Sequence, residues 1–232
     1  YVVGELLPKL FGLSRHYVDI VTIQQTIEAE AIHYESTTIK RYLQEWQSEG
    51  RIHDAGRGWY SDLSETFSAD THIESVDSVL ATIRADFPLL EHTIWSTREL
   101  TPFFHHLPTR HATFLMVDRD AIEPIAAALR DAGHRVAVHP LGDLAKAFTL
   151  EGEDTIILRP RLSSDHTSTR APIEQTLVDL HLEIQKLGLF EGEEFRHVVR
   201  NLSSRYRLNL TALKRYAERR KIDPVAILSA II

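Results

Sequence analysis

The hydrophobic pattern along the chain is most regular in residues 35–62. Four apolar side chains there share one helix face, at i, i+3, i+4 and i+7: Ile39, Tyr42, Leu43 and Trp46. Ser36 precedes them and is a suitable N-cap, because its hydroxyl can accept a backbone N–H of the first turn, and Gly50 ends the helix. The spacing therefore predicts an amphipathic helix that starts from the N-cap Ser36.

The opposite face of this helix is polar, and that face predicts a contact with double-stranded DNA. A helix laid in a major groove presents side chains near its N-terminus to base edges and phosphates. With the N-cap included, the expected contact residues are Ser36, Thr37, Thr38, Lys40, Arg41 and Gln44.

Two short strands, Arg51–His53 and Gly58–Ser61, are predicted to follow the helix around a tight turn. Arg57 lies at the tip of that turn, where it would reach a backbone phosphate. A recognition helix followed by such a hairpin is the pattern of a winged helix. Domains of this shape also bind proteins, so the fold alone leaves a protein-binding role open.

Two more helices are expected before the recognition helix, at Glu5–Leu13 and at Ile23–Ala29, the second capped by Thr22. Three helices and a hairpin predict that residues 1–62 form a winged helix-turn-helix DNA-binding domain. Residues 63–74 are polar and lack a sustained period, and we expect them to be a linker.

From residue 75 onward, helical and strand patterns alternate. Strands are expected at His92–Ser96, Ala112–Val117, Arg135–His139 and Asp154–Leu158. Helices are expected at Ser75–Phe87, Arg98–His106, Asp120–Ala132 and Leu141–Phe148. This alternation predicts a mainly parallel or mixed sheet with helices on its faces. Residues 75–232 therefore form an α/β domain that ends in a helical subdomain from about residue 171, with Pro172 at a first helical position.

Composition narrows the class of protein. The chain has 43% hydrophobic and 25% charged residues, as soluble globular chains do, and its lack of cysteine excludes disulfides and thiolate sites. No apolar run approaches the ~20 residues of a membrane span. We expect a cytoplasmic protein with no membrane partner.

The net charge of −7 is unevenly distributed. Residues 1–62 hold 6 Lys+Arg against 9 Asp+Glu, residues 63–189 hold 11 against 19, and residues 190–232 hold 9 against 5. DNA-binding domains usually carry a positive balance, so the DNA hypothesis requires the cations of the first segment to lie together on one face. These cations are Lys40, Arg41, Arg51 and Arg57.

Candidate catalytic and metal-binding residues are few. Asp118 and Asp120 have the spacing of metal ligands, but they lie where a strand gives way to a helix and the phosphate-cradling loop of nucleotidyltransferases is missing. The histidine pairs, such as His105 with His106, lack a repeated ligand spacing. A metal-dependent enzyme acting on nucleic acid is the least favoured hypothesis. We expect no catalytic residue, no metal and no cofactor.

The last helices hold the basic excess and predict a second binding face. Arg196 with Arg200, and Arg215 with Arg219, are i, i+4 pairs that share helix faces. Such a face would contact DNA phosphates or an acidic protein surface, including the chain's own acidic middle segment. The apolar end, AILSAII, must be buried in the core or in a homodimer interface.

Three stretches resemble AbiEi-like antitoxins, the transcription-repressing partners of toxins in type IV abortive-infection systems. They are STTIKRYLQEWQSEGRI followed by GRGWY, then APIEQTLVDLHLEI, then LNLTALKRYAERR. The resemblance covers roughly half the chain. It implies a DNA-binding transcriptional regulator whose second domain acts on a cognate toxin. The alternative is a protein-interaction module of a larger complex that does not bind DNA.

Overall fold

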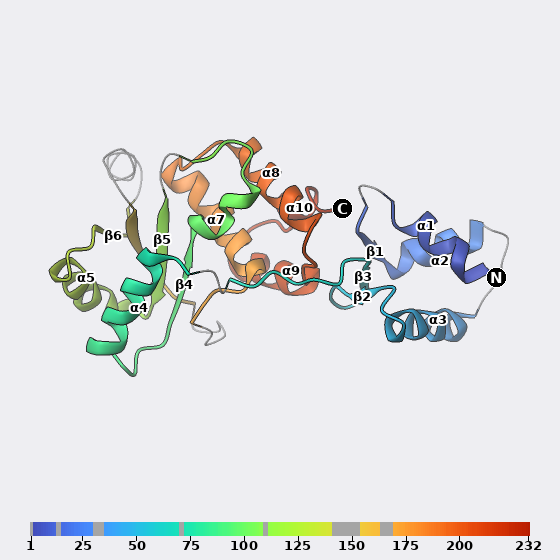
Figure 1. The fold of residues 1–232 in the computed structure, drawn as a ribbon, viewed down its shortest axis with the longest axis horizontal. Coiled ribbons are helices and arrows are strands. Elements are labelled where there is room, and N and C mark those ends of the chain that lie inside the picture. Colours follow the sequence, from blue (N-terminus) through green and yellow to red (C-terminus); the bar gives the residue numbers. More distant parts are fainter. Residues whose placement is uncertain are drawn as a thin grey trace. The chain divides into compact units, whose positions relative to one another are not determined.

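The computed structural model describes residues 2–12, 15–29, 35–69, 72–108, 111–140, 154–162 and 169–232. The fold is mixed α+β, with helices and two sheets (Figure 1). The chain divides into two compact units. Unit 1 comprises Tyr1–Phe67 and Val199–Ile232, and unit 2 comprises Ser68–Val198.

The N-terminal part of unit 1 consists of three helices and a small antiparallel sheet. Its elements are α1 (Val2–Leu10), β1 (Tyr17–Asp19), α2 (Ile20–Ala29), α3 (Ser36–Ser48), β2 (His53–Asp54) and β3 (Trp59–Ser61). The strand order is β1-β3-β2, so the second strand of the hairpin pairs with both other strands. One apolar core joins these elements, formed by Leu6, Leu10, Val18, Ile23, Ile27, Ile39, Leu43, Trp46 and Ile52.

The helix starts in this part differ from the sequence prediction. The N-cap of α3 is Glu35, whose backbone is extended, and Ser36 is already the first helical residue. The expected cap Thr22 lies inside α2, which begins at Ile20, because Asp19 accepts the backbone N–H of Thr22 at 2.7 Å. Strand β1 was not predicted, since a three-residue strand has too few positions to show a period.

The C-terminal part of unit 1 contains the end of α8 (Gly192–Ser203), followed by α9 (Leu210–Arg219) and α10 (Val225–Leu228). This division differs from the expected one, which placed all residues after 75 in a single domain. The C-terminal residues group with the N-terminal ones because they make hydrogen bonds to the hairpin and to the segment that follows it.

Unit 2 contains a four-stranded mixed sheet, as predicted. Its strands are β4 (His92–Ser96), β5 (Ala112–Val117), β6 (Val136–Val138) and β7 (Thr155–Pro160), in the order β4-β5-β7-β6. Strand β4 runs antiparallel to β5, whereas β5 and β6 both run parallel to β7.

Helices cover both faces of this sheet (Figure 1). On one face, α4 (Glu74–Asp86) and α5 (Ile122–Asp131) pack on the strands through an apolar core, and α7 (Ile173–Leu187) lies on the other face. The expected helix at residues 98–106 is instead the 3-10 helix η1 (Thr97–Phe103), which contains Pro102, and the short η2 (Arg119–Ala121) precedes α5. The expected helix at 141–148 lies outside the described residues.

Candidate nucleic-acid interface

Helix α3 has one buried and one exposed face. Ile39, Leu43 and Trp46 are buried in the core of unit 1. Because successive residues of a helix are rotated by about 100°, a polar row lies on the side opposite them. The row consists of Thr37, Lys40, Arg41 and Gln44, all exposed. The polar face that the sequence predicted for this helix is therefore present and exposed. That this face contacts DNA stays a prediction.

The remaining predicted contacts of α3 lie at its first turn. Ser36 is exposed and Thr38 is half-buried. The guanidinium of Arg41 lies 5.5 Å from the centre of the Tyr42 ring, which holds the cation close to the helix surface.

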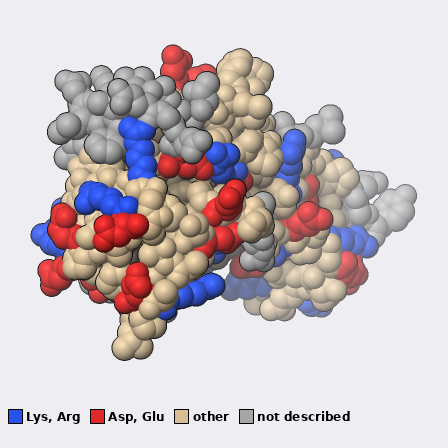
Figure 2. Space-filling view, turned by 60° about the vertical axis from the view of Figure 1, so that its left-hand side comes forward, with Lys and Arg blue, Asp and Glu red and all other residues tan. Residues whose placement is uncertain are grey.

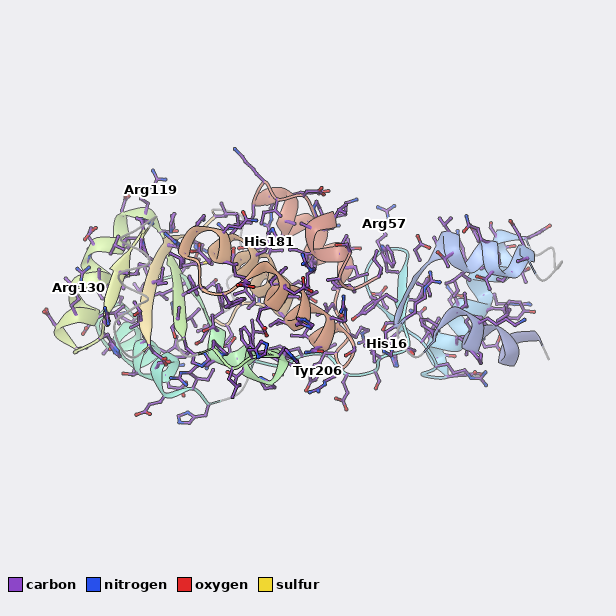
Figure 3. The ribbon with its side chains drawn as sticks, turned by 90° about the horizontal axis from the view of Figure 1, so that it is seen from above. His16, Arg57, Arg119, Arg130, His181 and Tyr206 are labelled. Carbon is purple, nitrogen blue, oxygen red and sulfur yellow. The ribbon has the colours of Figure 1, made fainter. Side chains whose placement is uncertain are left out.

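The hairpin between β2 and β3 presents Arg57 at its tip. Arg57 is exposed and its side chain points away from the ribbon (Figure 3). The two residues before it, Ala55 and Gly56, are buried. The backbone N–H of Leu210 donates to the carbonyl of Ala55 at 2.8 Å, so the tip is in contact with the start of α9.

The segment before α9 is fixed to the N-terminal sheet by Tyr17. This side chain is 2% exposed, and its hydroxyl donates to the carbonyl of Tyr206 at 2.9 Å. The same hydroxyl accepts the N–H of Leu208 at 3.0 Å. Two backbone groups of the C-terminal segment are thus satisfied by one side chain of β1.

Arg207 holds the segment that follows the hairpin. Its guanidinium donates to the carbonyls of Leu63 and Ser64, at 3.1 and 3.0 Å. The backbone N–H of Arg207 donates to the carbonyl of Glu65 at 2.6 Å. Part of the expected linker is therefore a paired segment of unit 1. Burial and the positive charge of Arg207 lower the pKa of His53 on β2.

When the C-terminal residues 199–232 are counted with residues 1–67 in unit 1, the net charge of the unit that holds the candidate interface changes from negative to positive. Residues 1–67 hold 6 Lys+Arg against 10 Asp+Glu, and residues 199–232 hold 8 against 2. Unit 1 therefore has 14 basic and 12 acidic residues, a balance of +2, whereas residues 68–198 have 12 and 21, a balance of −9. The positive balance that the first 62 residues lack is supplied by the C-terminal segment.

The four arginines predicted as a second face differ in their surroundings. All four are exposed: Arg196, Arg200, Arg215 and Arg219. Arg196 is paired with Glu193 one turn before it, and Arg219 lies 5.2 Å from the ring centre of Tyr216. The boundary between the units also falls within α8, between Arg196 and Arg200.

Several charged residues of unit 2 pair with one another. Asp118 accepts two hydrogen bonds from the guanidinium of Arg161, at 3.3 and 3.2 Å, and Glu91 accepts a third from it. Asp120 is exposed in η2. Within the described ranges, no group of three or more His, Asp or Glu side chains has the arrangement to hold a metal ion. Acidic and basic side chains are interspersed on the face drawn in Figure 2.

Unit 2 has one fully buried ion pair among its described residues, and a second in which only the carboxylate is buried. Arg159 on β7 donates to Glu183 on α7, with side chains 7% and 1% exposed, and also to the carbonyl of Pro140. Arg170 pairs with the buried Glu99 at 2.6 Å. These contacts tie helices to the sheet and leave the arginines little freedom to bind a ligand.

Sequence reasoning missed the residues that join the two parts of unit 1. Tyr17, Gly56, Arg207 and Asn209 carry this junction, and the sequence analysis named none of them as a contact residue, although Gly56 and Asn209 lie in the stretches GRGWY and LNLTALKRYAERR. Gly56 in the turn gave a local signal, since a glycine permits both a positive φ and a close backbone approach.

The structure is that of an α+β protein in which a basic C-terminal segment completes an N-terminal helix-and-hairpin unit. The chain belongs to a family of unknown function, DUF6577, which matches residues 38–226. That range begins in α3 and ends in α10, so it includes Gly56, Arg207 and Asn209 of the junction but not Tyr17. No curated protein matches the chain. Every helix in the described ranges is too short or too polar to cross a membrane.

Proposed function

We propose that the N-terminal part of unit 1 is a winged helix that binds double-stranded DNA through α3, and that the protein is a DNA-binding transcriptional regulator. The observation that carries the proposal is the row of exposed polar residues on α3 opposite its buried apolar face. The order of elements supports it: a helix, a strand, two helices and then a hairpin that pairs with the first strand. This order is compatible with a winged helix in which α3 is the recognition helix.

The side chains of α3 divide into two chemical kinds. Lys40 and Arg41 are exposed cations suited to backbone phosphates, which supply most of the affinity of DNA-binding proteins. Thr37 and Gln44 are neutral donors and acceptors, and a glutamine amide can pair with adenine in the major groove. The row therefore offers both positioning and base-reading groups on one surface.

The acidic unit 2 gives the proposal its second part. The resemblance to AbiEi-like antitoxins implies a protein partner, such as a toxin, for this half of the chain. A balance of −9 in residues 68–198 disfavours contact with phosphates and suits a partner with a basic surface. The binding of DNA and of a protein partner would then fall to different units.

DNA binding by the full chain tests the first part. Affinity for short duplexes of mixed sequence should be measured by fluorescence anisotropy at several salt concentrations. We expect the double variant Lys40→Ala/Arg41→Ala to bind more weakly. Its plot of log affinity against log salt should become shallower by about 0.9 for each phosphate that the variant no longer neutralises.

The matched control is Arg84→Ala/Arg119→Ala, which removes two exposed cations of unit 2. It changes the net charge equally and should leave the slope as in the wild type. Equal affinity and slope in wild type and Lys40→Ala/Arg41→Ala, with unchanged circular dichroism, would sink the assignment of α3. No measurable duplex binding by the wild type would instead favour a protein-interaction module.

A further inference from the structure

We propose that Lys214 and Arg215 on α9 form, with Arg57 at the hairpin tip, one phosphate-binding surface that extends the DNA contact beyond α3. This inference rests on the proposed function. The sequence alone paired Arg215 with Arg219, and the new grouping with Lys214 and Arg57 follows from the contact between the hairpin and α9.

The first step is the close approach of the hairpin tip to α9. A Cβ added to Gly56 would lie 2.6 Å from Oγ1 of Thr211 and 2.8 Å from both Oδ1 of Asn209 and the backbone nitrogen of Thr211. Gly56 also has φ of +109°, a conformation that favours glycine. Together with the hydrogen bond from Leu210 to Ala55, these contacts fix the tip on the first turn of α9.

The second step is the orientation of α9. Its buried side chains lie on one face: Leu210, Leu213, Tyr216 and Ala217. Thr211, Lys214 and Arg215 lie on the opposite face, at i, i+3 and i+4. Residues at this spacing have Cβ atoms about 5–6 Å apart. The two cations are therefore one helical turn from the residue that touches Gly56.

The third step concerns which cations are already engaged. Arg207 donates to backbone carbonyls, and Arg219 lies over the Tyr216 ring. By contrast, Arg57, Lys214 and Arg215 are exposed and take part in no salt bridge within the described part of the chain. These three cations keep their donors for an anion outside the chain.

The composition of the surface favours nucleic acid over a protein partner. The exposed and half-exposed positions of α9 hold Thr211, Ala212, Lys214, Arg215, Glu218 and Arg219. None is a large apolar or aromatic side chain, so arginine is the one residue type enriched at protein interfaces that this surface holds. Phosphate contacts need only cations and hydroxyls on an open surface. The surface also adjoins the hairpin that would lie beside α3 on the duplex.

The test compares variants of the full chain on one duplex that the wild type binds. Lys214→Ala/Arg215→Ala should bind more weakly, with a salt slope shallower by about 1.8 if each cation contacts one phosphate. Hydroxyl-radical footprinting should show a shorter protected stretch of backbone on one side only. Glu218→Gln, which removes the carboxylate from the same face, should bind more tightly than the wild type.

Arg15→Ala/Arg205→Ala is the matched control, because both residues are exposed cations of unit 1 outside this surface. If the slope of log affinity against log salt becomes as shallow in this control as in Lys214→Ala/Arg215→Ala, the effect is one of general charge and the inference is overturned. The inference also fails if Lys214→Ala/Arg215→Ala keeps the slope and footprint of the wild type while Lys40→Ala/Arg41→Ala loses affinity; the proposed function then survives. A wild type that binds no duplex overturns both.

Discussion

Tyr17 and Leu208 are 191 residues apart in the chain and are joined by a buried hydrogen bond of 3.0 Å. Through this bond and its partner to Tyr206, the first strand of the N-terminal sheet holds the segment that leads into α9. The junction brings a basic C-terminal segment onto an acidic N-terminal module, and so gives unit 1 its positive balance.

The hydroxyl of Tyr17 should contribute measurably to stability. Tyr17→Phe keeps the buried ring but leaves the N–H of Leu208 and the carbonyl of Tyr206 without this partner. An unsatisfied buried polar group costs about 1–3 kcal/mol, so the free energy of unfolding should fall by roughly that amount in urea titrations. Tyr60→Phe, a half-buried tyrosine of the same sheet, should cost less. Equal losses in the two variants would contradict a special role for Tyr17.

Alanine at Gly56 should destabilise the protein more than alanine at Gly50. Both glycines have positive φ, +109° and +68°, so each substitution carries the strain of a left-handed residue, of order 1–3 kcal/mol. Only at Gly56 does the new Cβ also meet backbone and side-chain atoms of Asn209 and Thr211; nothing lies within 4 Å at Gly50. Thermal unfolding of the two variants measures the difference. A Gly56→Ala protein as stable as Gly50→Ala would mean that the tip is not docked.

Removing one member of the buried pair of Arg159 and Glu183 should lower the free energy of unfolding more than replacing both members with apolar residues. Arg159→Met leaves the carboxylate of Glu183 buried opposite an uncharged chain, with Lys186 at 3.4 Å as the remaining cation. Such losses cost about 3–5 kcal/mol. The double variant Arg159→Met/Glu183→Leu removes both charges and should regain much of the lost unfolding free energy. Additive losses in the double-mutant cycle would show that the two side chains are not coupled.

Glu99 should make stability fall as pH rises towards neutral. Burial raises the pKa of Glu99 from 4.5 to about 7, outweighing the opposing effect of Arg170. When the pKa of a carboxyl is higher in the folded than in the unfolded protein, its contribution to stability is complete at pH values below the pKa of the unfolded state. That contribution is lost as the pH rises through the pKa of the folded state. Relative to Glu99→Gln, the wild type should therefore lose stability between pH 4.5 and about 7.

Urea titrations across that pH range measure this effect. Glu65→Gln, an exposed glutamate of the other unit, provides the control and should show a pH dependence parallel to that of the wild type. If Glu99→Gln follows the same curve as the control, the carboxyl of Glu99 titrates as an ordinary glutamate.

The sequence by itself determined the elements that repeat an apolar period over several turns or residues. The buried side chains of α3 and α4 follow their helical spacing, and the apolar run at Ala112–Val117 is a strand buried at every position. The alternation of these elements predicted a mainly parallel or mixed sheet, because connections between neighbouring strands and helices are local and short. The antiparallel pairing of β4 with β5 makes it mixed.

Only the tertiary structure decided the elements and contacts that depend on distant residues. Strand β1 forms because it pairs with β3, and α2 and α3 lie between these two strands in the chain. The segment η1 has an apolar pattern that predicts an α-helix, but it is a 3-10 helix that contains Pro102. The candidate site also has one part that the sequence predicted and one part that only the folded chain decided. The exposed face of α3 was predictable from spacing, whereas the pairing of Gly56 with α9 and of Tyr17 with Leu208 required the folded chain, since no local period encodes which surfaces meet.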